Sequence, residues 1–138
     1  HQNFETREKF ETAILKSLKS YQIDLIVLAG FMRILSPVFI KPYLGKLMNI
    51  HPSLLPKYPG LNTHQKVIDN HDTQHGVTIH LVDETLDGGP ICAQSIMKVE
   101  SNDIDVLENK IHNLEHKLYP KVIQSFAKGE LKLLEGKK

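Results

Sequence analysis

The chain has 138 residues, of which 41% are hydrophobic and 24% are charged, and its formal net charge is +1. These values fit a globular domain with its own core, and they give no electrostatic reason to expect a nucleic acid or an anionic membrane as a partner. Every apolar run is shorter than the about 20 residues that cross a bilayer. The single cysteine, Cys92, excludes an internal disulfide, which fits a location in the reducing cytoplasm.

The first half of the chain predicts alternating helices and strands. Apolar side chains spaced three and four residues apart predict a helix over residues 6–21. The apolar run over residues 24–30 predicts a strand buried on both faces of a parallel sheet. A loop at residues 31–35 follows, and the Ser36-Pro37 pair predicts the start of a short helix. Residues 46–51 predict the second strand.

The second half predicts an antiparallel pair of strands and a long helix. The loop between the strands predicted at residues 76–82 and 91–99 is too short for a parallel crossover. Residues 103–118 carry an apolar stripe, and Pro120 predicts a break or kink after it. The remaining predicted elements are a short helix at residues 62–70 and an edge strand at residues 131–134. Together these elements predict an α/β fold with a layered sheet.

The segment Asn49-Ile50-His51-Pro52 carries the strongest chemical signal. Asn49 and His51 are two residues apart, so a strand places them on the same face. Asp87 lies in a Gly-rich turn after the third strand, and ligands bind beyond the carboxyl ends of strands in such sheets. Taken singly, each residue is better explained by a structural role: Asn49 as a strand-end cap, His51 as a core histidine and Asp87 as a turn former. An amide, an imidazole and a carboxylate together indicate acyl-transfer or hydrolytic chemistry.

The other polar residues indicate less. Eight histidines are present, but the chain contains no His-Glu-x-x-His pair and no cysteine cluster, so a metal site is not expected. His80 is expected to support the site, because its face of the third strand is partly polar. Glu115 lies beside His112 and His116, and from the residues alone a solvated helix face is the better explanation of it.

Three segments resemble the phosphoribosylglycinamide formyltransferases (glycinamide ribonucleotide transformylases). They are residues 28–35 (LAGFMRIL), 49–56 (NIHPSLLP) and 86–90 (LDGGP). The resemblance covers residues 4–134. The pattern Asn-x-His-x-Ser-Leu-Leu-Pro is shared by the wider formyltransferase group. Residues 57–64 (KYPGLNTH) and the Gly-Gly pair before Pro90 are more similar to the purine enzymes than to methionyl-tRNA formyltransferases or formyltetrahydrofolate deformylases.

The resemblance implies a three-layer, Rossmann-like formyltransferase sheet, mostly parallel with an antiparallel strand near the C-terminus. Residues 1–138 are then a single domain that corresponds to the later part of the family's fold. The family's N-terminal strand, Gly/Ser/Asn loop and helix, which hold the substrate phosphate, are absent from it. The implied reaction transfers a formyl group from 10-formyltetrahydrofolate to the amine of glycinamide ribonucleotide, in cytoplasmic purine synthesis and without a metal. A homodimer is left open.

The resemblance also implies a role for each site residue. Asn49 is expected to hold the formyl oxygen while the tetrahedral intermediate forms, and His51 to stabilise that oxyanion and move a proton. Asp87 is expected to raise the pKa of His51 and to act through a water molecule. Further folate contacts are expected from Arg7, Met32, Arg33, Ile34, Leu35, Asn49, Asp83, Glu84, Thr85, Leu86 and Asp87. The apolar wall for the pterin is expected from Leu28, Phe39, Ile40, Leu47, Val82 and Leu86. Contacts with the ribonucleotide are expected from His112, Asn113, Leu114 and Glu115.

Two alternatives remain open from the sequence. A deformylase, which gives the formyl group to water, needs the amide, imidazole and carboxylate but no ribonucleotide site, so Glu115 would have no role. A non-catalytic folate- or nucleotide-binding module needs neither the proton-moving His51 nor its neighbour Asn49.

Overall fold

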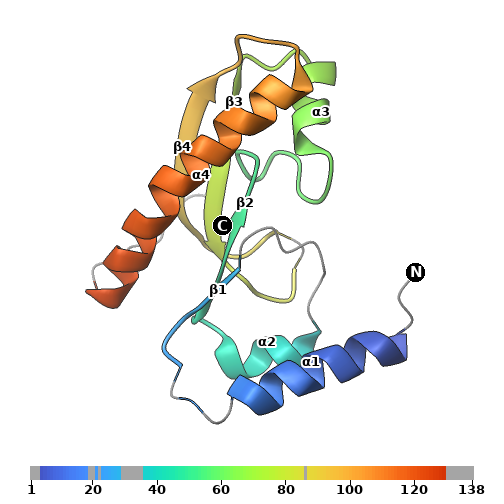
Figure 1. The fold of residues 1–138 in the computed structure, drawn as a ribbon, viewed down its shortest axis with the longest axis vertical. Coiled ribbons are helices and arrows are strands. Elements are labelled where there is room, and N and C mark those ends of the chain that lie inside the picture. Colours follow the sequence, from blue (N-terminus) through green and yellow to red (C-terminus); the bar gives the residue numbers. More distant parts are fainter. Residues whose placement is uncertain (1–3, 19–20, 22, 29–35, 86, 130–138) are drawn as a thin grey trace.

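The computed structural model describes residues 4–18, 21, 23–28, 36–85 and 87–129 (Figure 1). In chain order the elements are α1 (Phe4–Leu18), β1 (Ile26–Leu28), α2 (Pro37–Ile40), the 3-10 helix η1 (Lys41–Tyr43), β2 (Leu47–His51), α3 (Thr63–Asp69), β3 (Gln74–Leu81), β4 (Ile91–Lys98) and α4 (Ile104–Ala127). The predicted α/β class is confirmed. The predicted edge strand at residues 131–134 and the loop at residues 31–35 lie outside the described residues.

The described strands form one mixed sheet in the order β1-β2-β3-β4. β1 and β2 are parallel, with Leu28 opposite Asn49, whereas the β2–β3 and β3–β4 pairs are antiparallel. The antiparallel pairing of the third and fourth strands is therefore confirmed. The described strands do not form a mostly parallel sheet. The chain leaves β2 through a loop and the short helix α3 and enters β3 at the same end, so β3 runs antiparallel to β2.

The first strand begins later and is more exposed than the sequence predicted. β1 begins at Ile26, residues 29 and 30 of the predicted strand lie outside the described residues, and Val27 is 38% exposed. The expected burial on both faces is wrong for this strand, because β1 is the edge of the described sheet.

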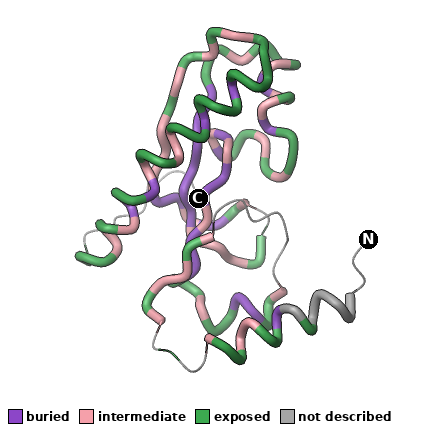
Figure 2. The backbone as a smooth tube through the Cα atoms, in the orientation of Figure 1, coloured by how far each residue is buried: buried purple, intermediate pink, exposed green. Residues whose placement is uncertain are grey.

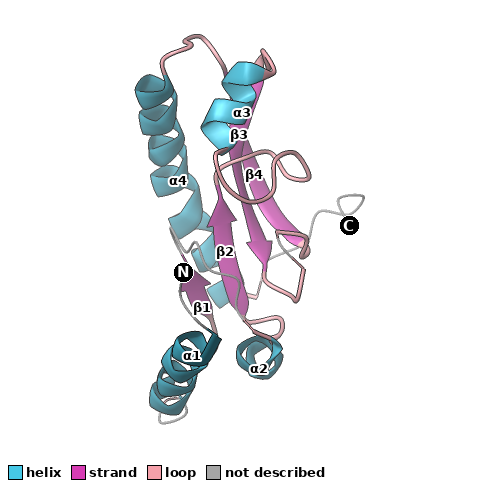
Figure 3. Ribbon diagram, turned by 90° about the vertical axis from the view of Figure 1, so that its right-hand side faces the viewer, coloured by secondary structure: helices cyan, strands magenta, loops and turns pink. Residues whose placement is uncertain are grey.

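Helices cover the sheet on both faces. Met48 and Ile50 belong to a buried cluster that includes Ile111 and Val122 of α4. Leu47 instead joins Phe39 and Ile40 in a second cluster, against which apolar side chains of α1 pack. Since successive strand residues point to opposite faces, α4 covers one face and α1 with α2 covers the other. Figure 3 shows this arrangement, and Figure 2 shows the buried residues concentrated along β2 and β3.

The long helix α4 continues through Pro120. Its N-cap is Asp103, whose side chain accepts hydrogen bonds from the backbone N–H groups of Asp105 and Val106. Pro120 is exposed, while Tyr119 and Val122 on either side of it are buried. Of the predicted break or kink at Pro120, the break is wrong, because packing against the sheet offsets the hydrogen bond that proline cannot form, while the kink stays a prediction.

The first helix ends earlier than predicted. α1 stops at Leu18, and Tyr21, which the apolar spacing placed on its buried stripe, is 71% exposed. Tyr21 lies outside the helix, so its side chain does not continue the apolar stripe.

Candidate active site

Strand β2 places Asn49 and His51 on one face of the sheet. Opposite them on the antiparallel strand β3 lie His80 and Thr78, respectively. Cross-strand partners share a face, so four polar side chains gather there, on the face opposite α4. His51, Thr78 and His80 are all at most 5% exposed.

The two ring nitrogens of His51 have different partners. Nε2 lies 2.8 Å from the carbonyl oxygen of Tyr58, and a carbonyl can only accept, so Nε2 carries the hydrogen. Nδ1 lies 3.5 Å from Oδ2 of Asp87. In the neutral ring Nδ1 has a lone pair, so only the protonated ring can donate to Asp87. Nδ1 is therefore the atom at which His51 gains and loses a proton.

Asp87 is fixed from three sides. Its Oδ2 accepts a 2.8 Å hydrogen bond from the backbone N–H of Gly60, and its Oδ1 lies 3.5 Å from Nε2 of His80. Asp87 itself has a φ of 52°, in the left-handed region that few residues other than glycine adopt. Burial acts to raise the pKa of Asp87, but the interactions with His80, Gly60 and His51 outweigh it, so the net pKa is lowered. Asp87 is thus an anion between two imidazoles.

The pKa of His51 is lowered from its ordinary value, because burial outweighs the opposing effects of the Tyr58 carbonyl and the Asp87 charge. The sequence analysis expected Asp87 to raise this pKa. That effect of Asp87 is confirmed, but burial is larger, and the sequence does not reveal how deeply the ring is buried.

One buried polar atom of this site, Oδ1 of Asn49, lacks a hydrogen-bond partner among the described residues. Nε2 of His80, at the opposing register position, makes no hydrogen bond there but lies 3.5 Å from Oδ1 of Asp87. Buried polar atoms are nearly always hydrogen-bonded, so the free amide oxygen of Asn49 indicates a place where a polar group of a ligand can bind.

The loop after His51 is held in place by Thr78 and Gln94. The Oγ1 of Thr78 accepts from the N–H of Leu55 and donates to the carbonyl of Ser53, and Gln94 Nε2 donates to the carbonyl of Leu55. The Leu55–Pro56 peptide bond within this loop is cis. These bonds place the Tyr58 carbonyl against His51.

The remaining predicted folate residues are only partly described. Met32, Arg33, Ile34, Leu35 and Leu86 lie outside the described residues, and Arg7 lies within α1. The side chain of Asp83 accepts from the N–H of Thr85, forming a turn in which Glu84 and Thr85 are exposed. The predicted apolar wall does gather in one cluster that contains Leu28, Phe39, Ile40, Leu47 and Val82. Its role toward a pterin stays a prediction.

The predicted ribonucleotide residues lie in the middle of α4. His112 and Asn113 are exposed, whereas Leu114 packs against the core. Glu115 is half-buried, and burial raises its pKa although His112 and His116 oppose the shift. Glu115 is therefore not the fully solvated side chain of the alternative interpretation.

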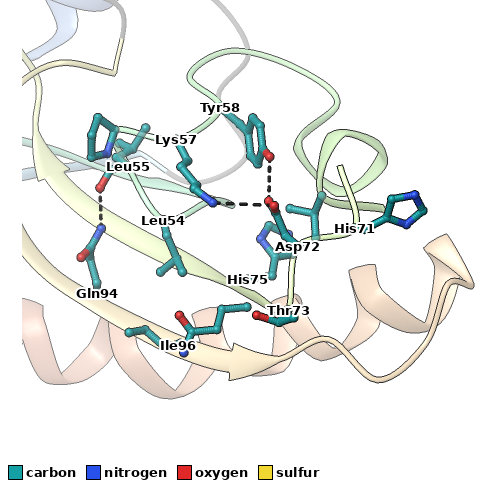
Figure 4. A pocket seen from close by; sticks show the side chains of 13 residues that line it. Leu54, Leu55, Lys57, Tyr58, His71, Asp72, Thr73, His75, Gln94 and Ile96 are labelled. Atoms are coloured by element: carbon teal, nitrogen blue, oxygen red, sulfur yellow. Dashed lines mark hydrogen bonds and ion pairs between the residues drawn. The ribbon is translucent and has the colours of Figure 1, made fainter. Parts of the chain in front are cut away.

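A pocket of about 460 Å³ lies beside this site but does not include Asn49, His51 or Asp87. Figure 4 shows Lys57 and Tyr58 on one side of it, both bonded to Asp72, with Gln94 and Ile96 across from them. Within the described part of the chain, no group of three or more histidine, cysteine or acidic side chains could hold a metal ion. No described helix is long and apolar enough to span a membrane.

Four contributors were missed by the sequence analysis. They are the backbone groups of Tyr58 and Gly60 and the side chains of Thr78 and Gln94. The backbone groups leave no signal in residue identity. Thr78 was signalled by its position two residues before His80 on the same strand face, which the alternation already showed.

Comparison with known proteins identifies the family of the chain. The family model described as "Formyl transferase" matches residues 1–123. The chain belongs to the formyl transferase family. The chain is 47% identical to the phosphoribosylglycinamide formyltransferase of Escherichia coli over 134 residues. The alignment covers 96% of this chain and 63% of that protein. The chain is also 39% identical to the trifunctional purine biosynthetic protein adenosine-3 of Homo sapiens, across 100% of this chain and 14% of that protein.

Solved formyl transferase structures share the fold. The phosphoribosylglycinamide formyltransferase of Coxiella burnetii superimposes with a TM-score of 0.85 at 43% identity, over 98% of this chain and 64% of that one. The glycinamide ribonucleotide transformylase 1 of Symbiobacterium toebii gives a TM-score of 0.87 at 35% identity, over 95% and 62% of the two chains. The chain thus spans somewhat less than two thirds of the length of these relatives.

Proposed function

We propose that this chain supplies the formyl-transferring and folate-binding part of a phosphoribosylglycinamide formyltransferase. The reaction moves the formyl group of 10-formyltetrahydrofolate to the amine of glycinamide ribonucleotide. The observation that carries the proposal is the cluster of Asn49, His51 and Asp87, in which the buried Oδ1 of Asn49 has no partner among the described residues. The names of the relatives supply the substrates. Residues 1–138 act as a single domain in this proposal.

The proposed chemistry begins with attack of the substrate amine on the formyl carbon. A carbon–nitrogen bond forms, and the carbonyl electron pair moves to oxygen as an oxyanion. The amide of Asn49 serves both partners, because its N–H donates to the oxyanion while its free Oδ1 accepts from the amine. A preorganised donor of this kind contributes about 3–4 kcal/mol to lowering the barrier.

His51 and Asp87 then handle the proton. The attacking nitrogen loses a proton toward Asp87, directly or through one water molecule, while a positive charge on His51 stabilises the oxyanion. Collapse of the intermediate breaks the bond to the folate nitrogen, which takes up the proton and leaves as tetrahydrofolate. Burial lowers the pKa of His51 and so opposes this positive charge, and the proposal relies on the nearby Asp87 carboxylate to hold the proton on Nδ1 while the oxyanion forms.

The folate and the ribonucleotide occupy opposite sides of this cluster in the proposal. The donor lies against the turn that contains Asp83, Glu84 and Thr85, together with residues 31–35 and Arg7. The ribonucleotide lies against α4 at Glu115, whose raised pKa comes from burial rather than from a protein ion pair.

The test is formyl transfer measured with the 138-residue chain and with the longest natural polypeptide that contains it. Replacing His51 with Asn should lower kcat by about 10²–10⁴-fold with little loss of affinity for the folate. His71→Asn is the matched control, since His71 is exposed and has a backbone conformation that asparagine tolerates. Unchanged turnover in His51→Asn would contradict the proposal. Release of formate without transfer would identify a deformylase, and folate binding without either reaction would identify a binding module.

A further inference from the structure

The hydroxyl of Tyr119 connects α4 to the two parallel strands. Its oxygen lies 2.6 Å from the carbonyl oxygen of Leu28 at the end of β1 and 3.2 Å from the carbonyl oxygen of Met48 in β2. A side chain from a helix near the end of the chain thus bonds both strands at the point where their pairing carries Asn49. The sequence did not indicate a role for Tyr119.

The Tyr119 hydroxyl acts as a hydrogen-bond donor in both contacts. Both carbonyls can only accept, so the single hydrogen of the hydroxyl serves the two acceptors. Tyr119 is 9% exposed, and burial raises its pKa, which keeps the hydroxyl protonated and able to donate. The bond is therefore present at any pH at which the protein is folded.

The helix has a gap in its backbone hydrogen bonding beside Tyr119. Pro120 follows directly and lacks the N–H that would bond the carbonyl four residues earlier, so α4 is short of one backbone hydrogen bond next to Tyr119. Among the described residues of α4, Tyr119 is the one whose side chain hydrogen-bonds to strand backbone rather than only packing against the sheet.

The hydrogen bonds of Tyr119 connect α4, which carries Glu115, to β2, which carries Asn49. The Met48 carbonyl directly precedes Asn49, the residue that contacts the formyl oxygen. Glu115 lies four residues before Tyr119, one turn away on the same side of α4, and its charge acts on the Tyr119 hydroxyl. The acceptor side of the site on α4 and the transfer side on β2 are thus linked through one hydroxyl.

We propose that Tyr119 is a positioning residue that sets the separation between Glu115 on α4 and Asn49 on β2, and so holds the ribonucleotide amine within reach of the formyl carbon. This inference rests on the proposed function. It assigns Tyr119 no contact with either substrate. Its effect is on the alignment of the two substrates, and a misplacement of about 1 Å can cost on the order of 10²-fold in rate.

The test replaces Tyr119 with Phe, which keeps the ring and removes only the hydroxyl. Formyl transfer by the longest natural polypeptide containing the chain should show a kcat lower by about 10–100-fold, with the KM for 10-formyltetrahydrofolate nearly unchanged. Val122→Ala is the matched control, because Val122 is buried on the same helix and contacts no strand carbonyl in the described structure. This variant should unfold at a lower temperature, yet keep kcat within about twofold of the parent.

A second readout is independent of turnover. The ¹H–¹⁵N signals of the Asn49 backbone and side-chain amides should shift in Tyr119→Phe and stay in place in Val122→Ala. Unchanged Asn49 signals, or a parent-like kcat in Tyr119→Phe, would overturn the positioning role. If the parent protein transfers no formyl group while the Asn49 signals still move only in Tyr119→Phe, the proposed function fails and the coupling between α4 and β2 stands.

Discussion

At the scale of single residues, the site is defined by which atom of each side chain is free. His51 uses Nε2 to bond the Tyr58 carbonyl and keeps Nδ1 toward Asp87, while Asn49 keeps Oδ1 without a partner. A fixed tautomer means that one known nitrogen carries out proton transfer. Chemistry of this kind depends on the backbone of the 52–60 loop as much as on the three named side chains.

Removing the charge of Asp87 should lower the pKa of His51 further. The carboxylate opposes the effect of burial, so Asp87→Asn leaves burial acting with less resistance. An amide at this position also donates to the Nδ1 lone pair, which stabilises the neutral ring. The measurement is an NMR titration of the His51 imidazole signals.

Asp69→Asn serves as the control for that titration, because Asp69 is an exposed carboxylate on α3 that bonds Gln65. It should leave the His51 pKa where it is. A rise of the His51 pKa in Asp87→Asn would show that the charge is not the relevant contribution of Asp87.

Periodicity in the sequence predicted the residues that share a face, but it did not predict electrostatic balance. The two-residue spacing placed Asn49 and His51 together, and the alternation in the third strand placed His80 with Thr78; both are confirmed. The effect of Asp87 on the pKa of His51 was predicted, but the larger effect of burial was not, because burial depends on the loop that folds over the ring and a single sequence contains no measure of that depth.

At the scale of elements, the β3–β4 connection places Asp87 by a close backbone contact at Gly89. A Cβ atom at Gly89 would lie 1.9 Å from the carbonyl oxygen of Leu81, and a backbone atom cannot move aside as a flexible side chain can. The turn therefore folds back onto the end of β3 only because residue 89 has no side chain.

Gly89→Ala should destabilise the protein by about 2 kcal/mol or more and displace Asp87. The change is measured from urea unfolding, and the His51 titration in the same variant should move toward that of Asp87→Asn. Gly129→Ala is the control, because Gly129 has a φ of 71° but an added Cβ there would meet no atom within 4 Å. This variant therefore has backbone strain without a steric clash. It should cost only about 1 kcal/mol. Equal losses in the two variants would argue against the close contact.

Element boundaries were predicted less well where tertiary packing decides them. The break expected at Pro120 did not occur, because buried residues on both sides of it fix α4 to the sheet. Conversely, the stripe that was extended to Tyr21 ended at Leu18. Local signals predicted that a helix exists, while contacts that are distant in sequence decided where it ends.

At the scale of the whole molecule, the fold brings four segments far apart in sequence to one place. β2, the 52–60 loop, the turn at Asp87 and α4 meet at the carboxyl end of β1 and β2. The α/β class and the antiparallel final pair were predictable from spacing and loop length. The balance of parallel and antiparallel strands was not, because an apolar run of a given length reads the same in either direction.

Stability of the whole protein should depend on pH through a buried pair of histidines outside the catalytic cluster. His75 is 1% exposed, and its Nε2 lies 3.0 Å from Nδ1 of His64 on α3. Burial, with a smaller effect of His64, lowers the pKa of His75 from 6.5 to about 4, and burial also lowers the pKa of His64. The folded protein therefore takes up these protons at a lower pH than the unfolded chain does.

The sign follows from linkage. Above pH 6.5 neither state protonates His75, and its full contribution to stability is present. Between pH 6.5 and about 4 the unfolded chain binds a proton that the folded protein excludes, so the free energy of unfolding falls as the pH falls. His75→Asn removes that difference, and its unfolding temperature should decline less steeply between about pH 7 and pH 5, by on the order of 5 °C. The exposed His71→Asn should keep the parent slope. A parent slope in His75→Asn would mean that His64 or the carboxylates, rather than His75, control the acid stability of the fold.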